Sequence, residues 1–363
     1  MARVFPKIEF ADKQLSAIAA KVENGERLVL ADGLTILNTS DLPGLGKLAD
    51  RAKRQRSGDA VYFSTNKHVN YTNICKMKCG FCRFSKSRDE VGAYEMSFDE
   101  IIANIEPTVR EVHLVGGLHP DWPFSHYVEM LKTIRINRPG VSIKGFTAVE
   151  ILHFSDFSGL STEQVLTEFK NAGLISMPGG GAEIFSPRVR KILCPKKPSG
   201  KKWLDVHKTA HGLGIPSNAT MLYGHVETFE ERIEHLTALR NLQDQTKGFL
   251  CFVPLPFQNW NKTGSTAPGS CDDLRMVALS RLYLDNFPHI KAYWVMLGLE
   301  TAIMSLCYGA DDMDGTVQGE KIAHAAGAQT PLGIDRDMIR FMARQAGKIA
   351  VERDSLYNRI QTC

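Results

Sequence analysis

From residue 60 onward the sequence alternates between short apolar runs and longer amphipathic stretches, and this alternation restricts the possible folds more than any other feature. Eight runs have the length and the apolar or β-branched composition of buried strands. They cover residues 61–65, 112–115, 141–146, 174–177, 217–223, 249–253, 292–297 and 313–317. Strands that alternate with helices form parallel βαβ units, because each helix returns the chain to the same edge of the sheet.

The amphipathic stretches begin with recognisable helix start signals. A capping box pairs Ser or Thr with Glu or Gln three residues later, so that their side chains satisfy free N–H groups of the first turn. Three pairs fit this pattern: Ser97 with Glu100, Ser161 with Gln164, and Thr228 with Glu231. After the third pair, apolar residues at 233, 236, 239 and 242 recur at helical spacing and predict one buried face.

Eight strand–helix units predict an α/β fold, a (βα)8 TIM-type barrel that forms a single domain over residues 60–363. A doubly wound sheet is the alternative, since the sequence does not show whether the barrel closes. Residues 9–56 read as helical, so residues 1–59 are expected to form an N-terminal helical extension. In a barrel the functional groups gather where strands end and loops begin.

Composition and charge narrow the classes of function. The formal net charge of +4 is too small to indicate nucleic-acid binding, although it suits an anionic small substrate. The first residues lack the apolar core of a signal peptide, and no apolar run is long enough to span a membrane. We therefore expect a cytoplasmic protein, whose eight cysteines are thiols or metal ligands rather than disulfides.

Three cysteines stand close together in the segment NYTNICKMKCGFCRF, residues 70–84. Their spacing is Cys75-x3-Cys79-x2-Cys82. Cysteine thiolates hold iron–sulfur clusters, and three of them leave one iron of a [4Fe–4S] cubane open for a substrate. A structural zinc site normally needs four protein ligands, and no fourth Cys or His follows at a suitable distance. A zinc module or a non-catalytic iron–sulfur sensor remains the alternative.

This segment resembles the signature of the radical S-adenosylmethionine superfamily. The resemblance implies a [4Fe–4S] cluster on the three cysteines and S-adenosylmethionine bound beside it. It places Phe81, the aromatic residue before the last cysteine, near the adenine. It also implies that Gly116 and Gly117 contact the methionine amino group through their backbone. The superfamily usually has an acidic residue next, but Leu118 stands here.

A wider set of motifs narrows the resemblance over about residues 60 to 358. The ordered set includes EVHLVGGLHPD, FTAVEI, PGGGAEIF, TAHGLGIPSNATMLYGHVET and LDNFPHIKAYWVMLG. It resembles the radical enzymes of the futalosine route to menaquinone. The resemblance implies that S-adenosylmethionine is consumed as a substrate, its 5′-deoxyadenosyl group being added to 3-[(1-carboxyvinyl)oxy]benzoate, with bicarbonate released. It also implies a reducing partner such as flavodoxin or ferredoxin.

Sister enzymes of the same superfamily are the nearest alternative. Cyclic dehypoxanthine futalosine synthase and the deazaflavin-cofactor synthase share the NYTN-type approach to the cluster. They depart from this chain at TMLYGHVET and NFPHIKAYW.

Two further residues are candidates for binding S-adenosylmethionine. Glu183 follows three glycines at the end of the fourth predicted strand, where a carboxylate could accept hydrogen bonds from ribose hydroxyls. Asn218 lies on the fifth strand and is expected to point into the barrel, within reach of the nucleoside. For each, a structural polar side chain is the alternative reading.

Candidates for chemistry and for the second substrate come from strand ends and from the cluster loop. His225 and Glu227 follow the fifth strand, and His225 could act as a general acid or base or simply pair with Glu227. Four residues are predicted to contact the second substrate: His68, Arg83, His119 and Tyr223. The sequence leaves open which residues hold its carboxylates.

Overall fold

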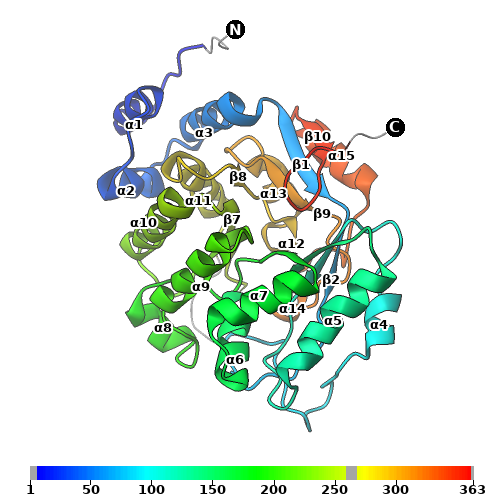
Figure 1. Ribbon diagram of the computed structural model, residues 1–363. Helices are drawn as coiled ribbons and strands as arrows, with labels where there is room; N and C mark the ends of the chain where they lie inside the picture. Colours follow the sequence, from blue (N-terminus) through cyan, green and yellow to red (C-terminus); the bar gives the residue numbers. More distant parts are fainter. Residues whose placement is uncertain (1–5, 259–267, 361–363) are drawn as a thin grey trace.

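The computed structural model describes residues 6–258 and 268–360, and its parallel strands form a barrel surrounded by helices (Figure 1). The first barrel strand is broken into β1 and β2, and a further strand, β10, pairs with β1. The strands are β1 (Ala60–Ser64), β2 (Asn66–Val69), β3 (Glu111–Leu114), β4 (Ser142–Gly145), β5 (Leu174–Ser176), β6 (Ser217–Tyr223), β7 (Phe249–Pro256), β8 (His289–Ile290), β9 (Asp312–Gly315) and β10 (Ile349–Glu352).

The barrel is closed. Ladders join β2 to β3, β4 and β5 in turn, and join β6 to β7 and β8. The bridge between Met177 and Ser217 connects β5 to β6, and the bridge between Lys291 and Asp312 connects β8 to β9. Pairing of β9 with β1 completes the circle, with parallel pairing at every step. The predicted (βα)8 barrel is therefore confirmed, and the doubly wound alternative does not apply.

The helices follow the strands as the capping signals predict. All three predicted capping boxes form, with the backbone N–H of Ser97 donating to Glu100 at 2.7 Å and that of Thr228 donating to Glu231 at 2.9 Å. The helices that follow the first barrel strand are α4 (Phe98–Ala103), α5 (Phe124–Asn137), α6 (Ala148–Ser158), α7 (Thr162–Ala172), α8 (Pro187–Leu193), α9 (Gly200–Gly212), α10 (Phe229–Thr246), α11 (Ser270–Tyr283), α12 (Trp294–Leu297), α13 (Leu299–Ser305), α14 (Ile322–Ala325) and α15 (Arg336–Gln345).

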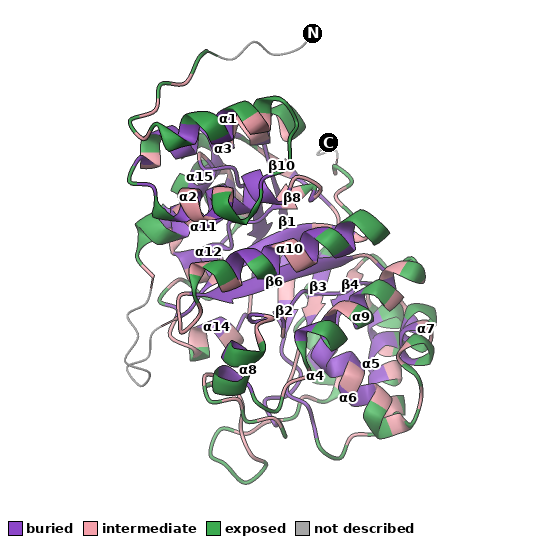
Figure 2. Cartoon of the chain, turned by 90° about the vertical axis from the view of Figure 1, so that its left-hand side faces the viewer, coloured by how far each residue is buried: buried purple, intermediate pink, exposed green. Residues whose placement is uncertain are grey.

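Helix α10 shows how the apolar pattern directs packing. Its residues Ile233, Leu236, Leu239 and Leu242 are buried, as the helical spacing predicts. Figure 2 shows buried positions alternating with exposed ones along α10, which lies in front of β6. One apolar stripe therefore attaches the helix to the barrel while its other side faces solvent.

One predicted strand is wrong. Residues 292–297 were expected to extend as a strand, but the strand is β8, which ends at Ile290, and Trp294–Leu297 is the helix α12. A short, fully apolar run does not distinguish a strand from a buried helix. Here tertiary packing decides, since the buried indole of Trp294 donates to the carbonyl of Gly315 at 2.9 Å.

The N-terminal segment folds into α1 (Gln14–Glu23), α2 (Leu30–Asn38) and α3 (Leu42–Ser57), as predicted. Helix α2 packs against the barrel helices α10 and α11, and α3 packs against α11, while α1 packs against α2 and α3. Arg27 adds ion pairs to Asp244 at 2.6 Å and to Asp285 at 2.9 Å. The boundary at residue 59 stays a prediction, and residues 1–5 and 361–363 of the two predicted domains lie outside the described residues.

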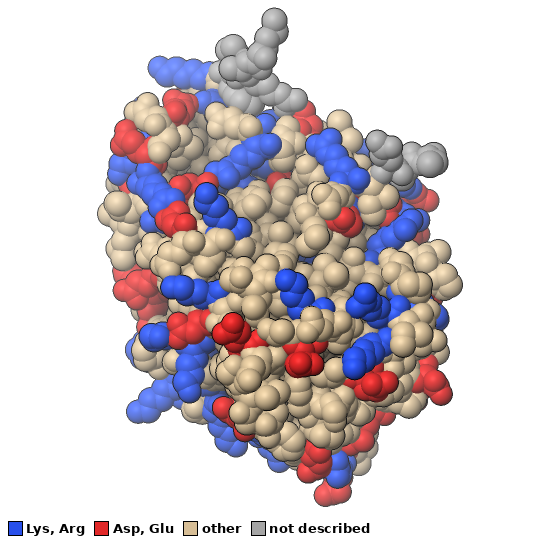
Figure 3. All heavy atoms as spheres, in the orientation of Figure 1, with Lys and Arg blue, Asp and Glu red and all other residues tan. Residues whose placement is uncertain are grey.

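The described surface is mixed in charge. Figure 3 shows lysine and arginine interspersed with aspartate and glutamate over one face of the molecule. Across residues 6–258 and 268–360, no helix combines the length and apolar character needed to cross a bilayer.

Candidate active site

A cavity of about 340 Å³ lies at the carboxyl ends of the barrel strands. Its lining comes from the loops after the strands and from inward-facing strand residues, as expected for a TIM-type barrel. One part of the wall is apolar: Val115, Leu222, Val253, Leu255, Phe257, Met296 and Ile322. Polar groups and the cysteine loop form the rest, so the cavity suits a ligand with both apolar and charged parts.

The three predicted cluster cysteines line this cavity together. Backbone hydrogen bonds shape their loop, because Cys75 N–H donates to Lys86 O and Cys82 N–H donates to Cys79 O, both at 3.0 Å. Burial raises the pKa of the Cys79 thiol to about 11 and also raises that of Cys82. Metal binding overcomes such a shift, since thiols lose their protons when they ligate iron.

The donor set fits a [4Fe–4S] cluster. Three thiols on one loop face a cavity large enough for a bound co-substrate. Among the described residues, no three His, Cys, Asp or Glu side chains converge closely enough to hold a single metal ion. A cubane does not need such convergence, because its thiolates bind different irons.

The glycine pair after β3 lies against the cysteine loop. Gly117 N–H donates to Thr72 O at 2.8 Å, and a Cβ at Gly117 would stand 2.2 Å from the carbonyl oxygen of Ile74. A Cβ at Gly116 would stand 2.5 Å from the ring of Tyr71. Only glycine allows this approach, so the pair sets the distance between β3 and the cysteine loop.

Glu150 lies beside this pair and was not predicted as a site residue. It is 1% exposed and lines the cavity. Its carboxylate accepts hydrogen bonds from Tyr71 OH at 2.6 Å and from Gly116 N–H at 3.2 Å. It also accepts from Thr147 N–H at 2.6 Å, as part of a capping box. Burial raises the pKa of Glu150 above its usual value.

Glu183 lines the cavity and has a cationic partner, while its contact with the ribose stays a prediction. Its carboxylate lies 2.5 Å from Lys197 Nζ, and this ammonium also stands 5.2 Å from the centre of the Phe81 ring. Burial opposes ionisation of Glu183, but Lys197 outweighs it and lowers the pKa of Glu183. Glu183 also has a left-handed backbone, with φ of 46°, which is unusual outside glycine and often marks functional sites.

Successive side chains of β6 point in turn to the inside and to the outside of the barrel. Asn218, Thr220 and Leu222 line the cavity, so the prediction that Asn218 points inward is confirmed. Tyr223 has the opposite parity, and its hydroxyl donates to Asp273 of α11 at 2.6 Å. Tyr223 therefore faces the helix layer and does not reach the cavity.

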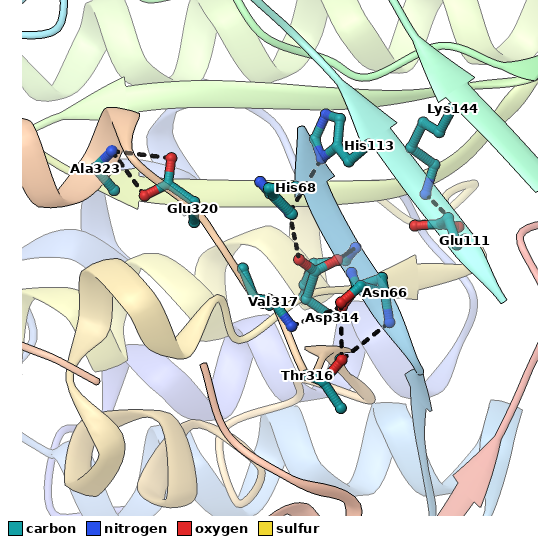
Figure 4. Close-up of polar contacts among 12 residues, drawn as sticks. Asn66, His68, Glu111, His113, Lys144, Asp314, Thr316, Val317, Glu320 and Ala323 are labelled. Atoms are coloured by element: carbon teal, nitrogen blue, oxygen red, sulfur yellow. Dashed lines mark hydrogen bonds and ion pairs between the residues drawn. The ribbon is translucent and has the colours of Figure 1, made fainter. Parts of the chain in front are cut away.

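Polar side chains form a row inside the barrel (Figure 4). His68, His113 and Lys144 occupy paired positions on β2, β3 and β4, and all three line the cavity. His113 Nδ1 lies 3.3 Å from His68 Nε2, which lies 4.0 Å from Asp314 Oδ2. Lys144 pairs with Glu111 at 2.9 Å. Of these residues only His68 was predicted as a site residue.

His225 and Glu227 lie outside the cavity lining. His225 Nε2 contacts Leu222 O at 2.9 Å, while Nδ1 lies 2.8 Å from Glu227. Glu227 also accepts from Gly224 N–H and pairs with Arg232 at 2.7 Å. These contacts hold the turn between β6 and α10, which is the structural alternative given above for His225.

Two predicted substrate contacts also lie outside the lining. His119 is buried, and its Nε2 pairs with Glu95 at 2.8 Å while Nδ1 accepts from Trp122 N–H at 3.1 Å. Arg83 is exposed at the surface of the cysteine loop. The structure therefore brings together the cysteines, Phe81, the glycine pair, Glu183, Asn218 and His68, and leaves out His119, Arg83, Tyr223, His225 and Glu227.

Family models and known proteins agree with this geometry. The model of the radical SAM superfamily matches residues 69–239, and the model of the CofH/MqnC C-terminal region matches residues 246–362. Aminodeoxyfutalosine synthase of Thermus thermophilus is 45% identical over 360 residues, 96% of this chain and 97% of its own. The synthase of Streptomyces coelicolor is 39% identical, covering 93% of this chain and 92% of its own.

The chain belongs to the radical S-adenosylmethionine enzymes, in the family that includes the aminodeoxyfutalosine synthases. It is therefore an enzyme that uses a [4Fe–4S] cluster and S-adenosylmethionine, and the sensor and zinc alternatives do not apply. A 5-amino-6-(D-ribitylamino)uracil–L-tyrosine 4-hydroxyphenyl transferase of Methanopyrus kandleri is also similar, at 38% identity over 87% of this chain and 88% of its own.

Solved structures share the fold. Methylornithine synthase superimposes with a TM-score of 0.72 over 92% of this chain and 97% of its own, at 16% identity. The hydrogenase maturase HydG of Carboxydothermus hydrogenoformans superimposes with a TM-score of 0.73 over 95% of this chain and 81% of its own, also at 16% identity. At this identity the likeness concerns the fold alone.

Proposed function

We propose that this enzyme joins the 5′-deoxyadenosyl group of S-adenosylmethionine to 3-[(1-carboxyvinyl)oxy]benzoate. The products are 6-amino-6-deoxyfutalosine, methionine and bicarbonate, so the reaction belongs to menaquinone biosynthesis. The observation that carries the proposal is 45% identity to an aminodeoxyfutalosine synthase over nearly the full length of both chains. The motifs that resemble that route span both matched regions, residues 69–239 and 246–362.

The side chains that line the cavity are suited to this reaction. Cys75, Cys79 and Cys82 would hold the cluster, which supplies the electron that cleaves S-adenosylmethionine. Glu183 would accept hydrogen bonds from the ribose, while Phe81 would lie against the adenine. The apolar wall offers a surface for an aromatic ring and keeps water away from a reactive radical.

The direct test is anaerobic turnover. Reconstituted enzyme is mixed with S-adenosylmethionine, reductant and 3-[(1-carboxyvinyl)oxy]benzoate, and products are identified by mass spectrometry. We expect an adduct that contains adenine and the benzoate ring. Formation of 5′-deoxyadenosine alone would contradict the proposal.

Cysteine variants provide the control for the cluster. Cys82→Ala should lose most of the bound iron and the adduct, whereas Cys194→Ala should keep both. Cys194 is buried at the C-terminal end of α8 and does not line the cavity. Its replacement therefore removes a thiol without removing a cluster ligand, which makes it the control for Cys82→Ala.

The second candidate function is the tyrosine transfer reaction. It is favoured by the match to the CofH/MqnC C-terminal region and by 38% identity to the Methanopyrus kandleri transferase. Incubation with L-tyrosine and 5-amino-6-(D-ribitylamino)uracil in place of the benzoate distinguishes the two. Turnover with this pair and none with the benzoate would establish the second candidate.

The cellular setting is also a proposal. We infer a cytoplasmic enzyme reduced by flavodoxin or ferredoxin, because the reaction needs a low-potential electron at a cluster that tolerates little oxidant. Replacing the chemical reductant with each purified protein in the turnover assay tests the donor.

A further inference from the structure

In the described part of the chain, the polar row inside the barrel contains a buried nitrogen without a hydrogen-bond partner, on a side chain that lines the cavity. Among the described residues, His113 Nε2 is buried and has no hydrogen-bond partner. His113 itself lines the cavity at the carboxyl end of β3. A buried polar atom without a partner destabilises a protein, so such atoms commonly have a function.

The neighbours of His113 determine which of its nitrogens carries the proton. Burial lowers the pKa of both His68 and His113, so both rings are neutral near pH 7. Asp314 is ionised, because Lys291 outweighs the effect of burial and lowers the pKa of Asp314. A carboxylate attracts an N–H and repels a nitrogen lone pair, so Asp314, 4.0 Å from His68 Nε2, favours the tautomer of His68 with its proton on that nitrogen.

This proton decides the tautomer of His113. The same N–H of His68 faces His113 Nδ1 at 3.3 Å, so His113 Nδ1 is the acceptor. A neutral imidazole has one proton, which then lies on His113 Nε2. Figure 4 shows Asp314, His68 and His113 following one another in this order. The row therefore leaves, on a side chain that lines the cavity, a hydrogen-bond donor with no partner among the described residues.

We propose that His113 Nε2–H binds a carboxylate oxygen of the second substrate, an aromatic acid, and that His68 and Asp314 are positioning residues for this donor. The inference rests on the proposed function for the identity of that acid. Lys144 occupies the partner position of His113 on β4 and also lines the cavity, where its ammonium pairs with Glu111 at 2.9 Å. The apolar wall of Val253, Leu255 and Phe257 can then pack on the aromatic ring.

The test compares the wild type with His113→Phe and His113→Gln as reconstituted enzymes with S-adenosylmethionine present. Phenylalanine fills the space without a donor, whereas the glutamine amide places an N–H close to the Nε2 position. We expect His113→Phe to raise the Kd of 3-[(1-carboxyvinyl)oxy]benzoate about tenfold or more, and His113→Gln to raise it much less. The Kd of S-adenosylmethionine should stay within about twofold, because His113 binds the other substrate.

His126→Phe is the matched control. His126 Nε2 is also buried without a hydrogen-bond partner among the described residues, but His126 lies outside the cavity lining. This variant should leave both dissociation constants unchanged. Unaltered benzoate binding by a folded His113→Phe enzyme, or an equal loss for both ligands, would overturn the inference.

The design separates this inference from the proposed function. If the wild type binds L-tyrosine and not the benzoate, the proposed function fails. The same three enzymes are then titrated with L-tyrosine, and the inference stands only if His113→Phe weakens tyrosine binding selectively.

Discussion

The carboxylate of Glu150 accepts a hydrogen bond from the backbone N–H of Gly116 across 3.2 Å, which joins the first turn of α6 to the glycine pair after β3. Glu150 thus brings a carboxylate to the glycine pair, while Leu118 stands at the sequence position where the superfamily usually has an acidic residue. The groups that lower the pKa of Glu150 are the neutral donors Tyr71, Thr147 and Gly116, and burial outweighs them. A cationic ligand in the cavity would stabilise this buried carboxylate.

We therefore predict that Glu150→Gln weakens binding of S-adenosylmethionine, whose methionine portion carries an ammonium group. Loss of a charge-assisted hydrogen bond of about 1.5–3 kcal/mol corresponds to a roughly tenfold or greater rise in Kd. Glutamine can still cap α6, so the melting temperature should change little. Titration calorimetry measures the Kd, and Glu100→Gln in the exposed capping box of α4 is the control. An unchanged Kd in Glu150→Gln would contradict the prediction.

Gly117→Ala should disturb the cluster loop. The added Cβ would stand 2.2 Å from Ile74 O, so the loop must shift away from β3. Overpacking of this kind destabilises by about 1–3 kcal/mol, and we expect a clear decrease in iron per protein after reconstitution. Gly80→Ala, in the same loop, has no atom within 4 Å of the added Cβ and should retain its iron. Equal iron content in the two variants would show that the close approach is not needed.

Lys197→Gln should destabilise the fold, because it leaves the buried carboxylate of Glu183 without its cation. Breaking such a pair costs about 3 kcal/mol, and we expect the melting temperature to decrease by several degrees. The neighbouring exposed Lys196 provides the control in Lys196→Gln. The double variant Glu183→Gln/Lys197→Gln should recover part of the loss, since neither charge remains. A single variant as stable as the wild type would rule out this role for the pair.

Stability should depend on His324 in alkaline solution. The hydrogen bond with Glu320 raises the pKa of His324 from 6.5 to about 9. The protonated ring therefore stabilises the folded enzyme fully below pH 6.5, and this contribution is lost as the pH rises through 9. The melting-temperature difference between wild type and His324→Gln should be largest near pH 6 and small at pH 10. A difference that is constant with pH would contradict the assignment.

Some site residues could be predicted because their positions follow from local rules. The spacing of Cys75, Cys79 and Cys82 places them on one loop, and the glycines at 116 and 117 indicate close backbone approach. Strand parity placed Asn218 inside the barrel. The same parity puts Tyr223, five residues later, on the opposite side of the strand, so its place outside the cavity lining could have been predicted from the sequence.

Other site residues had only weak signals. Lys144 and His113 are polar residues within predicted strands, which indicates a polar position inside the barrel but not its partner. Lys197 is adjacent to a second lysine in a loop, and nothing local distinguishes Lys197, which is partly buried, from the exposed Lys196. His225 and Glu227 resembled an acid–base pair, but only the fold shows that they hold a turn.

The sequence by itself determined the alternation of strands and helices, the capped helix starts and the cysteine loop, because each depends on residues a few positions apart. Only the tertiary structure decided that the barrel closes, that residues 294–297 are helical and that Glu150 meets Gly116. It also joined His68 and Asp314, which are distant in sequence, into one row with His113. Such contacts depend on how strands pair around the barrel, and no local pattern encodes that arrangement. The three cysteines determine where the cluster binds, and closure of the barrel determines which side chains line the cavity beside it.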